Sequence, residues 1–563
     1  MFLDPPQTFP WGAIGAAARR PRHPHRISAS QFDRADRRLL AGVVTPVLLL
    51  LLALGFFLAF FHPATLEVGN AGWLIRDSDN GENALGAHAY WHDSAAGASL
   101  GTKLLNAPDG VPVLYTDSNP LVTLAGKPFA RLMPVDAQLV GPFILFSLVL
   151  QATFAWLLLR RHAPGPIALW AGVVLLAFPP TLANRFVHAN LMAHWTILAA
   201  LYLYLDTERG HRLARWMPLI AVTALIHSYL LVMVGAIWAS AMLVRFVEGS
   251  GRTRFVTVAQ GAAVLAMVAL LAHWLGVGDQ MWTGTFGTYA MPLDALWNPG
   301  NGNLSRLLPS PGGDPGRWSE GFQYLGAGGL LLVAAASVVA RVRPARDGER
   351  ATGRRLRGLV PALVVLGALA SIHFPLPVVA MKLLDPVRAS GRLFWPVGYV
   401  LVLMAILAIF RLSAERAALA LIGMVALQIV DLGGMATMIR AQSRAADEHR
   451  LYSRTPDPRW SRLVGQARSI AFLPGDVTRD LGLFQEIAWR AVDAGRPVTN
   501  VYAARTSQAT LRRLHAEATA FARGELVPGR LYVLLSGAAV PVAAASRVLH
   551  LDGVTVVAPV RWR

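Results

Sequence analysis

The chain has 563 residues, of which 54% are hydrophobic and only 15% are charged, and its formal net charge is +19. Soluble domains average about 25% charged residues, so the composition excludes a wholly soluble protein and predicts a membrane protein. The positive charge lies in short segments between apolar runs, which favours a membrane surface over a nucleic-acid partner, and the absence of cysteine excludes disulfides and thiolate chemistry.

The N-terminal residues 1–38 are polar and basic, and an apolar run follows at 40–61. This run is too long for the hydrophobic region of a cleavable signal peptide and long enough to cross a bilayer. We therefore predict a cytoplasmic basic tail over 1–38 and an uncleaved first membrane helix.

Apolar runs of membrane-spanning or nearly spanning length recur along the next 400 residues. They cover 40–61, 139–159, 166–182, 190–206, 213–226, 228–246, 254–276, 323–341, 357–373, 393–411 and 415–436. Basic clusters separate them at 160–162, 209–215, 245–254, 341–357 and 411–416. A single orientation of the chain in the membrane places every basic cluster in the cytoplasm. In that orientation the long loops at 62–138 and 277–322 lie on the outer side. The pattern predicts a polytopic α-helical membrane domain over 39–437 with about eleven transmembrane helices, and the composition favours the inner membrane of a bacterium.

The segment 213–246 allows two interpretations. Both of its ends are basic, so the orientation requires an even number of crossings, with a tight break near His227. Two short helices satisfy this requirement and would line a cavity, because irregular backbone at membrane depth needs protein or water around it. The alternative is one long tilted helix, which would invert the orientation of the helices on one side of it.

The last segment, 438–563, has a different character. Strands are predicted at 469–473, 498–502, 531–535 and 554–557, and helices at 481–494 and 507–524. Strand and helix alternate, which indicates a small soluble α/β domain on the extracytoplasmic side. We find neither a glycine-rich phosphate loop nor a nucleophile elbow in it.

Two acids lie early in the first outer loop, at Asp77 and Asp79. Neighbouring carboxylates near a bilayer surface act as a general base, hold a divalent cation such as Mg²⁺ or Mn²⁺, or pair with a basic residue. The alternative is an ordinary solvated loop. Further along, Asp117 begins an Asp-Ser-Asn-Pro turn whose alternative role is to cap a helix.

Other polar residues gather at the predicted outer ends of the apolar runs. Arg185, His188 and Met192 would share one face if the helix continued through them. The remaining members of this group are His194, His227, Tyr229, Arg388 and Arg392. Each taken alone is typical of an interfacial residue. Together they describe a face with carboxylates, imidazoles and guanidiniums, which suits an anionic phosphate leaving group and an acceptor hydroxyl.

The order of these motifs resembles the bacterial polytopic membrane glycosyltransferases of the GT-C fold and, more closely, the uncharacterised DUF6311 membrane family. The matching pieces are Asp79, Gly86, Tyr90-Trp91, Asn106-Ala-Pro, Thr116-Asp-Ser-Asn-Pro-Leu, Lys127, Arg185-x-x-His188, His194-Trp195, Ile226-His-Ser-Tyr229, Phe286-Gly-Thr-Tyr289, Glu320-Gly-Phe-Gln-Tyr-Leu-Gly326 and Gly391-Arg-Leu-Phe-Trp395. They cover the membrane region, and the C-terminal domain adds little to the resemblance. This chain departs from the commonest GT-C pattern, because Asp77 and Asp79 are not adjacent.

The resemblance implies transfer of a sugar from a polyprenyl-phosphate donor to a glycan, lipid or protein acceptor on the outer face of the cytoplasmic membrane. It implies Asp79 as the base, with Asp77 as the second carboxylate, and Arg388 and Arg392 as ligands of the donor phosphate. Asp117, Lys127, Arg185, His188, His194, His227, Tyr229, Glu320, Gln323 and Tyr324 are expected to bind substrate. The alternatives are a transporter or flippase for a lipid-linked saccharide, which usually contains internal repeats, and a non-catalytic envelope assembly protein.

Overall fold

The computed structural model describes residues 29–94, 100–208, 210–278, 283–374 and 376–559. The chain divides into two compact units, Met1–Leu48 and Leu49–Arg563. Within the first, the described part is the beginning of helix α1, and residues 1–28 of the predicted basic tail lie outside the described residues. The second unit contains the rest of α1 and every later element.

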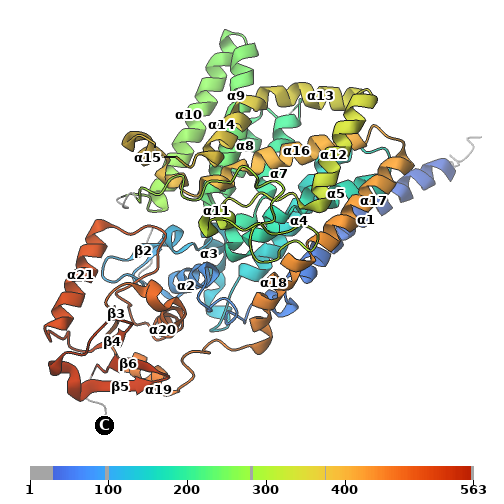
Figure 1. The fold of residues 1–563 in the computed structure, drawn as a ribbon. Helices are drawn as coiled ribbons and strands as arrows, with labels where there is room; N and C mark the ends of the chain where they lie inside the picture. Colours follow the sequence, from blue (N-terminus) through green and yellow to red (C-terminus); the bar gives the residue numbers. More distant parts are fainter. Residues whose placement is uncertain (1–28, 95–99, 209, 279–282, 375, 560–563) are drawn as a thin grey trace, which may run out of the picture. The chain divides into compact units, whose positions relative to one another are not determined.

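The larger unit is mostly helical (Figure 1). The α-helices are α1 (Ala29–Phe60), α2 (Asp79–His92), α3 (Pro120–Gly126), α4 (Val140–Leu159), α5 (Pro166–Ala177), α6 (Pro180–Ala183), α7 (Trp195–Leu205), α8 (Leu213–Ile226), α9 (Ser228–Glu248), α10 (Gly251–Trp274), α11 (Pro315–Glu320), α12 (Gly326–Val342), α13 (Asp347–Leu356), α14 (Val360–Ser371), α15 (Val378–Leu384), α16 (Trp395–Ile409), α17 (Ala414–Asp431), α18 (Gly433–Ser443), α19 (Arg459–Gln466), α20 (Leu481–Asp493) and α21 (Gln508–Ala522). Short 3₁₀ helices that matter for the site are η2 (Val113–Thr116), η4 (Asn184–Val187), η5 (Ala189–Met192), η7 (Asp385–Val387) and η8 (Ser390–Phe394).

Each of the eleven predicted apolar runs coincides with a helix, but fewer than eleven are long enough to cross a membrane. Within the described residues, five helical segments qualify by length and composition: Gly42–Phe60, Val140–Leu159, Ser228–Glu248, Gly251–Trp274 and Ser390–Ile409. Up to eight qualify if three bent helix pairs count as one span each. The apolar helices Ala189–Leu205, Leu213–Ile226 and Val360–Ser371 are shorter. The structure therefore supports a multi-pass helical domain with five to eight candidate spans, where about eleven were predicted. The difference arises because several apolar runs form short or bent helices.

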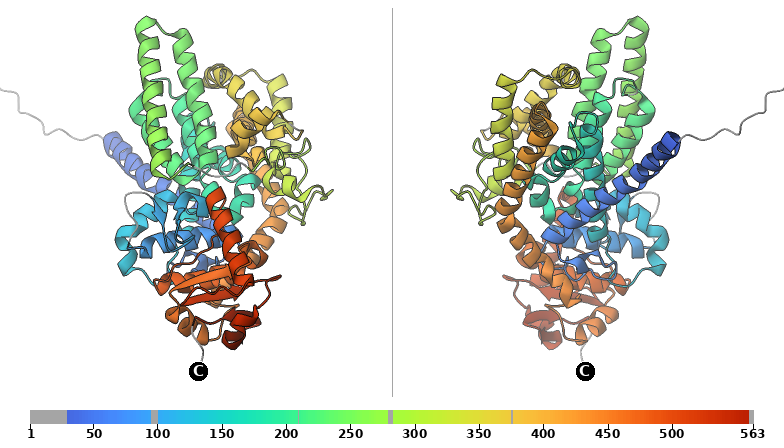
Figure 2. Two further views of the ribbon diagram at one scale, coloured as in Figure 1. Left: turned by 90° about the vertical axis from the view of Figure 1, so that its left-hand side faces the viewer. Right: turned by 90° about the vertical axis from the view of Figure 1, so that its right-hand side faces the viewer.

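The segment 213–246 forms two helices, as the interpretation with an even number of crossings requires. Helix α8 ends at Ile226 and α9 begins at Ser228, with His227 extended between them at φ −165° and ψ 137°. The chain reverses there, since the Arg245 guanidinium donates a hydrogen bond to the His211 carbonyl at the other end of the pair. Helices α8, α9 and α10 pack side by side (Figure 2).

The first long loop, 62–138, is more ordered than its sequence suggested. Its described residues contain α2, α3, three 3₁₀ helices and an antiparallel pair of short strands, β1 (Gly101–Thr102) and β2 (Val111–Pro112). Helix α2 begins at Asp79 because the Ser78 hydroxyl caps it by accepting a hydrogen bond from the Gly81 N–H at 3.0 Å. Nearly all of α2 is buried, so this loop is part of the folded core.

The C-terminal segment contains a mixed four-stranded sheet, which confirms a small α/β region. Its strands are β3 (Ser469–Leu473), β4 (Arg530–Leu534), β5 (Val548–Leu551) and β6 (Val554–Val557), in the order β3-β4-β6-β5. Strand β3 is parallel to β4, and the other two pairings are antiparallel. The helices predicted at 481–494 and 507–524 correspond to α20 and α21, whereas β5 and α19 were not predicted.

The strand predicted at 498–502 does not form. Val498 makes only an isolated parallel bridge to Ile470. Its N–H instead donates to the Leu104 carbonyl at 2.8 Å, and its carbonyl accepts from the Ala107 N–H at 2.9 Å. The backbone hydrogen bonds of this segment are divided between β3 and the first long loop, so the segment cannot form a continuous ladder with either. Helix α20 packs on α2, and these contacts join the C-terminal region to the first long loop (Figure 1).

Candidate functional site

A polar cavity of about 630 Å³ lies where the first long loop meets the ends of several apolar helices. Its volume falls in the range of small-molecule sites, roughly 300–1,000 Å³. The ionisable and phenolic residues lining it are Asp79, Glu82, Tyr115, Asp117, His188, His227, Tyr229, Tyr289, Glu320, Lys382, Asp385, Arg388, Arg392, Tyr502 and Arg505. The C-terminal region contributes the last two, so the cavity is assembled from both predicted domains.

His188 sits at the centre of a cluster of carboxylates. Its Nδ1 lies 3.4 Å from Asp117 Oδ2, and its Nε2 lies 3.4 Å from Glu320 Oε1 and 3.6 Å from Asp79 Oδ2. Irregular backbone at His188 and Asp117 places both side chains in the cavity wall. His188 separates η4 from η5, and Asp117 adopts a left-handed conformation with φ 55° between η2 and α3. The helix does not continue through Met192, since the chain forms two 3₁₀ turns there, so the shared face considered for Arg185, His188 and Met192 does not form.

Two imidazoles of this cluster are held in opposite protonation states. Burial lowers the pKa of His188, but hydrogen bonds to Asp117 and Glu320 outweigh burial and raise the pKa to about 9. Burial lowers the pKa of His227 to about 4, although Asp117 partly opposes this shift from 3.8 Å away. At neutral pH His188 is therefore a cation and His227 is neutral. Burial raises the pKa of Asp117, but its contact with the His188 cation prevails and the net pKa is lowered.

Glu320 joins the cluster to two arginines. Its Oε2 accepts from Arg185 Nη1 at 2.7 Å and from Arg392 Nε at 2.6 Å. Arg185 and Arg392 are buried, and the Glu320 side chain is 13% exposed. The Arg392 guanidinium also lies over the Tyr229 ring, 4.8 Å from its centroid. Burial raises the pKa of Glu320, but the two guanidiniums hold it well below its usual range. Arg392 is thus already paired with Glu320, which it shares with Arg185, before any ligand binds.

Two carboxyl groups at the start of α2, those of Asp79 and Glu82, line one side of the cavity. Asp79 Oδ1 accepts a hydrogen bond from the Tyr502 hydroxyl at 3.0 Å, and the Asp79 side chain is 34% exposed. Glu82 lies one turn further along the same helix face. It is buried, and within the described chain neither of its carboxylate oxygens has a hydrogen-bond partner. Burial, followed by Asp79 and Asp117, raises the pKa of Glu82 well above its usual value, which favours the protonated form of this carboxyl.

Basic residues line the cavity around the segment between α15 and η8. Arg505 reaches across from the C-terminal region to Asp385, with 3.1 Å between Nη1 and Oδ2. Arg388 is half-buried, and its side chain makes no hydrogen bond or ion pair to any residue that the structure describes. Of the two arginines expected to hold a phosphate, Arg388 therefore keeps its whole guanidinium free of protein partners within the described chain, whereas Arg392 already donates from Nε to Glu320.

Several residues expected at the site lie elsewhere. The Lys127 ammonium donates to the Tyr90, Trp91 and Asp93 carbonyls at 2.6–3.1 Å, which caps the end of α2. The other four line no part of the cavity: Asp77 is exposed, His194 is buried against Tyr399, Gln323 donates to the Gly391 carbonyl, and Tyr324 donates to Asp431. Arg185 reaches the site only through Glu320.

Seven of the ionisable and phenolic residues that line the cavity were not among the site residues expected from the sequence: Glu82, Tyr115, Tyr289, Lys382, Asp385, Tyr502 and Arg505. A signal existed for Glu82, because it follows Asp79 by three residues and shares its helix face. No local signal marks Tyr502, which lies 423 residues from its partner Asp79.

The expected Asp77–Asp79 cation site is not supported by the geometry. Among the described residues these two acids join no third carboxylate or imidazole in a group compact enough to hold a metal ion. The His188 cation and the Arg392 guanidinium already place positive charge among the cavity acids. The negative charge of the carboxylates around Asp79 is therefore compensated by the protein's own cationic side chains.

Comparison with known proteins identifies the family. No curated protein matches the sequence and no solved structure matches it. Residues 459–559 match the model of the DUF6311 C-terminal domain, which covers the four-stranded sheet. Residues 50–433 match the model of the domain of unknown function DUF6311, which is more than half of the chain. The chain therefore belongs to the DUF6311 family.

Proposed function

We propose that this protein is a membrane glycosyltransferase that uses a polyprenyl-phosphate-linked sugar. The observation that carries the proposal is the make-up of its cavity: the accessible carboxylate of Asp79 and the uncommitted guanidinium of Arg388 line one space. Sugar transfer from a phosphate donor needs a group that accepts a proton and a group that stabilises the departing phosphate. The cavity supplies both.

In the proposed step, Asp79 accepts the proton of the acceptor hydroxyl. The hydroxyl oxygen forms a bond to the anomeric carbon while the bond from that carbon to the phosphate oxygen breaks. The electron pair leaves with the phosphate, whose charge Arg388 stabilises. Attack from the face opposite the leaving group inverts the anomeric configuration. The Tyr502 hydroxyl and the His188 imidazolium orient Asp79 from the two sides of its carboxylate.

The position of the cavity along the helices supports a lipid-linked substrate. Tyr229 is in the first turn of the candidate span Ser228–Glu248, and Arg392 is in the first turn of Ser390–Ile409. A donor anchored in the bilayer would therefore reach the cavity with its phosphate at the membrane surface. The distribution of basic clusters along the sequence favours the outer face of the cytoplasmic membrane for these helix ends.

A transporter or flippase of a lipid-linked saccharide is the second candidate. One observation favours it: the helix pair Pro166–Ala177 and Pro180–Val187 is bent by 43° and ends beside His188 in the cavity. Discontinuous helices that end at a substrate site are typical of secondary transporters. A purely structural role in the envelope is disfavoured, because it gives no reason for a buried, unpaired carboxyl such as Glu82 in the cavity wall.

The two candidates are separated by transfer in proteoliposomes. Purified protein is reconstituted with bacterial lipid extract that carries radiolabelled polyprenyl-phosphate sugars. We expect label to move from the lipid to an acceptor with the wild type and not with Asp79→Asn. Asp77→Asn is the matched control, because Asp77 is exposed and two residues away, and it should retain transfer.

The pattern of outcomes is decisive. Full transfer by Asp79→Asn would refute the assignment of the base. Label that changes leaflet equally in all three proteins, without reaching an acceptor, would favour the flippase.

A further inference from the structure

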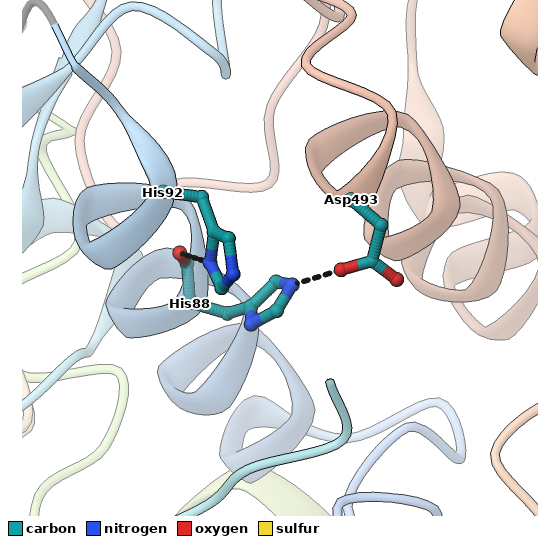
Figure 3. A group of neighbouring side chains, drawn as sticks. All are labelled: His88, His92 and Asp493. Carbon is teal, nitrogen blue, oxygen red and sulfur yellow. Dashed lines mark hydrogen bonds and ion pairs between the residues drawn. The ribbon is translucent and has the colours of Figure 1, made fainter. Parts of the chain in front are cut away.

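A second polar cluster lies outside the cavity, between α2 and α20. His88 and His92 are one turn apart on α2, and Asp493 is the last residue of α20 (Figure 3). One nitrogen of each imidazole and one Asp493 oxygen all lie within 4.8 Å of one another. None of the three residues lines the cavity, so the cluster is separate from the proposed catalytic site.

The hydrogen bonds determine which atoms are available for binding. His92 Nδ1 lies 3.0 Å from the His88 carbonyl oxygen. A carbonyl only accepts, so Nδ1 carries the proton and the lone pair of His92 is on Nε2. A metal-bound histidine commonly donates its second ring N–H to a backbone carbonyl in this way. His92 is therefore already in the tautomer that a metal ligand requires.

His88 and Asp493 are positioned just as firmly. The buried His88 ring stacks on Trp489, with 3.9 Å between ring centroids and 12° between planes. His88 Nε2 lies 2.7 Å from Asp493 Oδ1. The second Asp493 oxygen lies 3.4 Å from the Tyr452 hydroxyl. These contacts hold one imidazole and one carboxylate in place beside the exposed His92 ring.

The geometry points to a binding site for a divalent transition-metal ion, formed by His88, His92 and Asp493. Two imidazoles and one carboxylate are a donor set that Zn²⁺ uses, with ligand distances of roughly 2.0–2.2 Å and a fourth position for water. A tetrahedral ion would need its ligand atoms roughly 3.4 Å apart. It would replace the proton that His88 Nε2 and Asp493 Oδ1 share at 2.7 Å, and these two atoms would move apart to hold it. Imidazole ligands favour Zn²⁺, Co²⁺ or Ni²⁺ over Mg²⁺.

Such an ion would join two parts of the chain that are distant in sequence. Helix α2 belongs to the first long loop and carries Asp79 and Glu82 at its other end, whereas α20 belongs to the C-terminal region. An ion bound by both helices would fix α2 against the C-terminal sheet. The ion is structural in this proposal, since it lies outside the cavity and would act by stabilising the folded state.

Cobalt binding tests the site directly. Full-length protein in detergent, freed of its purification tag and treated with a chelator, is titrated with Co²⁺, whose visible absorption reports coordination by nitrogen and oxygen. We expect one saturable Co²⁺ site that Zn²⁺ displaces, and a rise in melting temperature with Zn²⁺. His92→Ala should weaken binding at least roughly 100-fold, because changes even to groups behind a ligand cost 10–100-fold.

Two controls make the test decisive. His515→Ala removes an exposed histidine on α21 and should leave Co²⁺ binding unchanged. Asp493→Asn keeps an acceptor for His88 and should weaken binding while the metal-free melting temperature stays near that of the wild type. The proposal is overturned if the wild type binds no Co²⁺, or if His92→Ala binds Co²⁺ as tightly as the wild type.

Discussion

Replacing Glu320 with glutamine is the most informative single perturbation of the charged cluster. Glu320 accepts hydrogen bonds from Arg185 and Arg392 and approaches the His188 cation. The amide keeps one oxygen as an acceptor but removes the negative charge. Three positive groups would then face one another without the carboxylate that joins them.

The structure gives the size of the effect. The side chains of Glu320, Arg185 and Arg392 are only 13%, 3% and 8% exposed, so water screens them little. Removing one partner of a buried ion pair costs about 3–5 kcal/mol. Because the glutamine oxygen still accepts one hydrogen bond, we expect Glu320→Gln to lose about 3 kcal/mol of unfolding free energy. That is a large share of the roughly 5–15 kcal/mol typical of a folded protein.

Equilibrium unfolding in mixed detergent micelles measures this loss. Asp347→Asn is the matched control, because the Asp347–Arg350 pair is exposed on both sides and contributes at most about 1 kcal/mol. An unfolding free energy of Glu320→Gln within about 1 kcal/mol of the wild type, the worth of an exposed pair, would refute the reasoning. It would mean that the two arginines find other partners when the carboxylate is removed.

Two further predictions concern protons. The pKa of His188 is raised from 6.5 to about 9 in the folded state. The protonated imidazole therefore contributes its full stabilisation of the folded state below pH 6.5, and this stabilisation is lost as the pH rises through 9. Wild-type stability should therefore fall by about 3 kcal/mol over that window, and a His188→Gln variant that shows the same slope would contradict the assignment. The pKa of Glu82 is raised in the folded state, so ionising this carboxyl costs more free energy there than in the unfolded state, and stability falls as the pH rises above the usual pKa of a glutamate. Glu82→Gln should be more stable than the wild type at pH 7 and no more stable at pH 4, as measured by the same unfolding titration.

The amino-acid sequence by itself determined which segments are helical and that polar residues gather near the ends of the apolar helices. Every predicted apolar run is helical because its length and composition leave no other way to satisfy the backbone. The reversal at His227 followed from the basic residues at both ends of 213–246. Asp79, Asp117 and His188 were recognised because charged groups near apolar helix ends are costly without a function or a partner.

Only the tertiary structure decided which polar residues share a site. Lys127 caps α2 instead of lining the cavity, and Tyr502 lines it from 423 residues away, because side-chain partners are set by packing rather than by spacing. The same holds for the segment 498–502, whose strand pattern is overridden when the first long loop takes its hydrogen bonds. The number of candidate spans likewise depends on bends and breaks in the helices, such as the one between Pro166–Ala177 and Pro180–Val187, which the apolar composition of the sequence does not reveal.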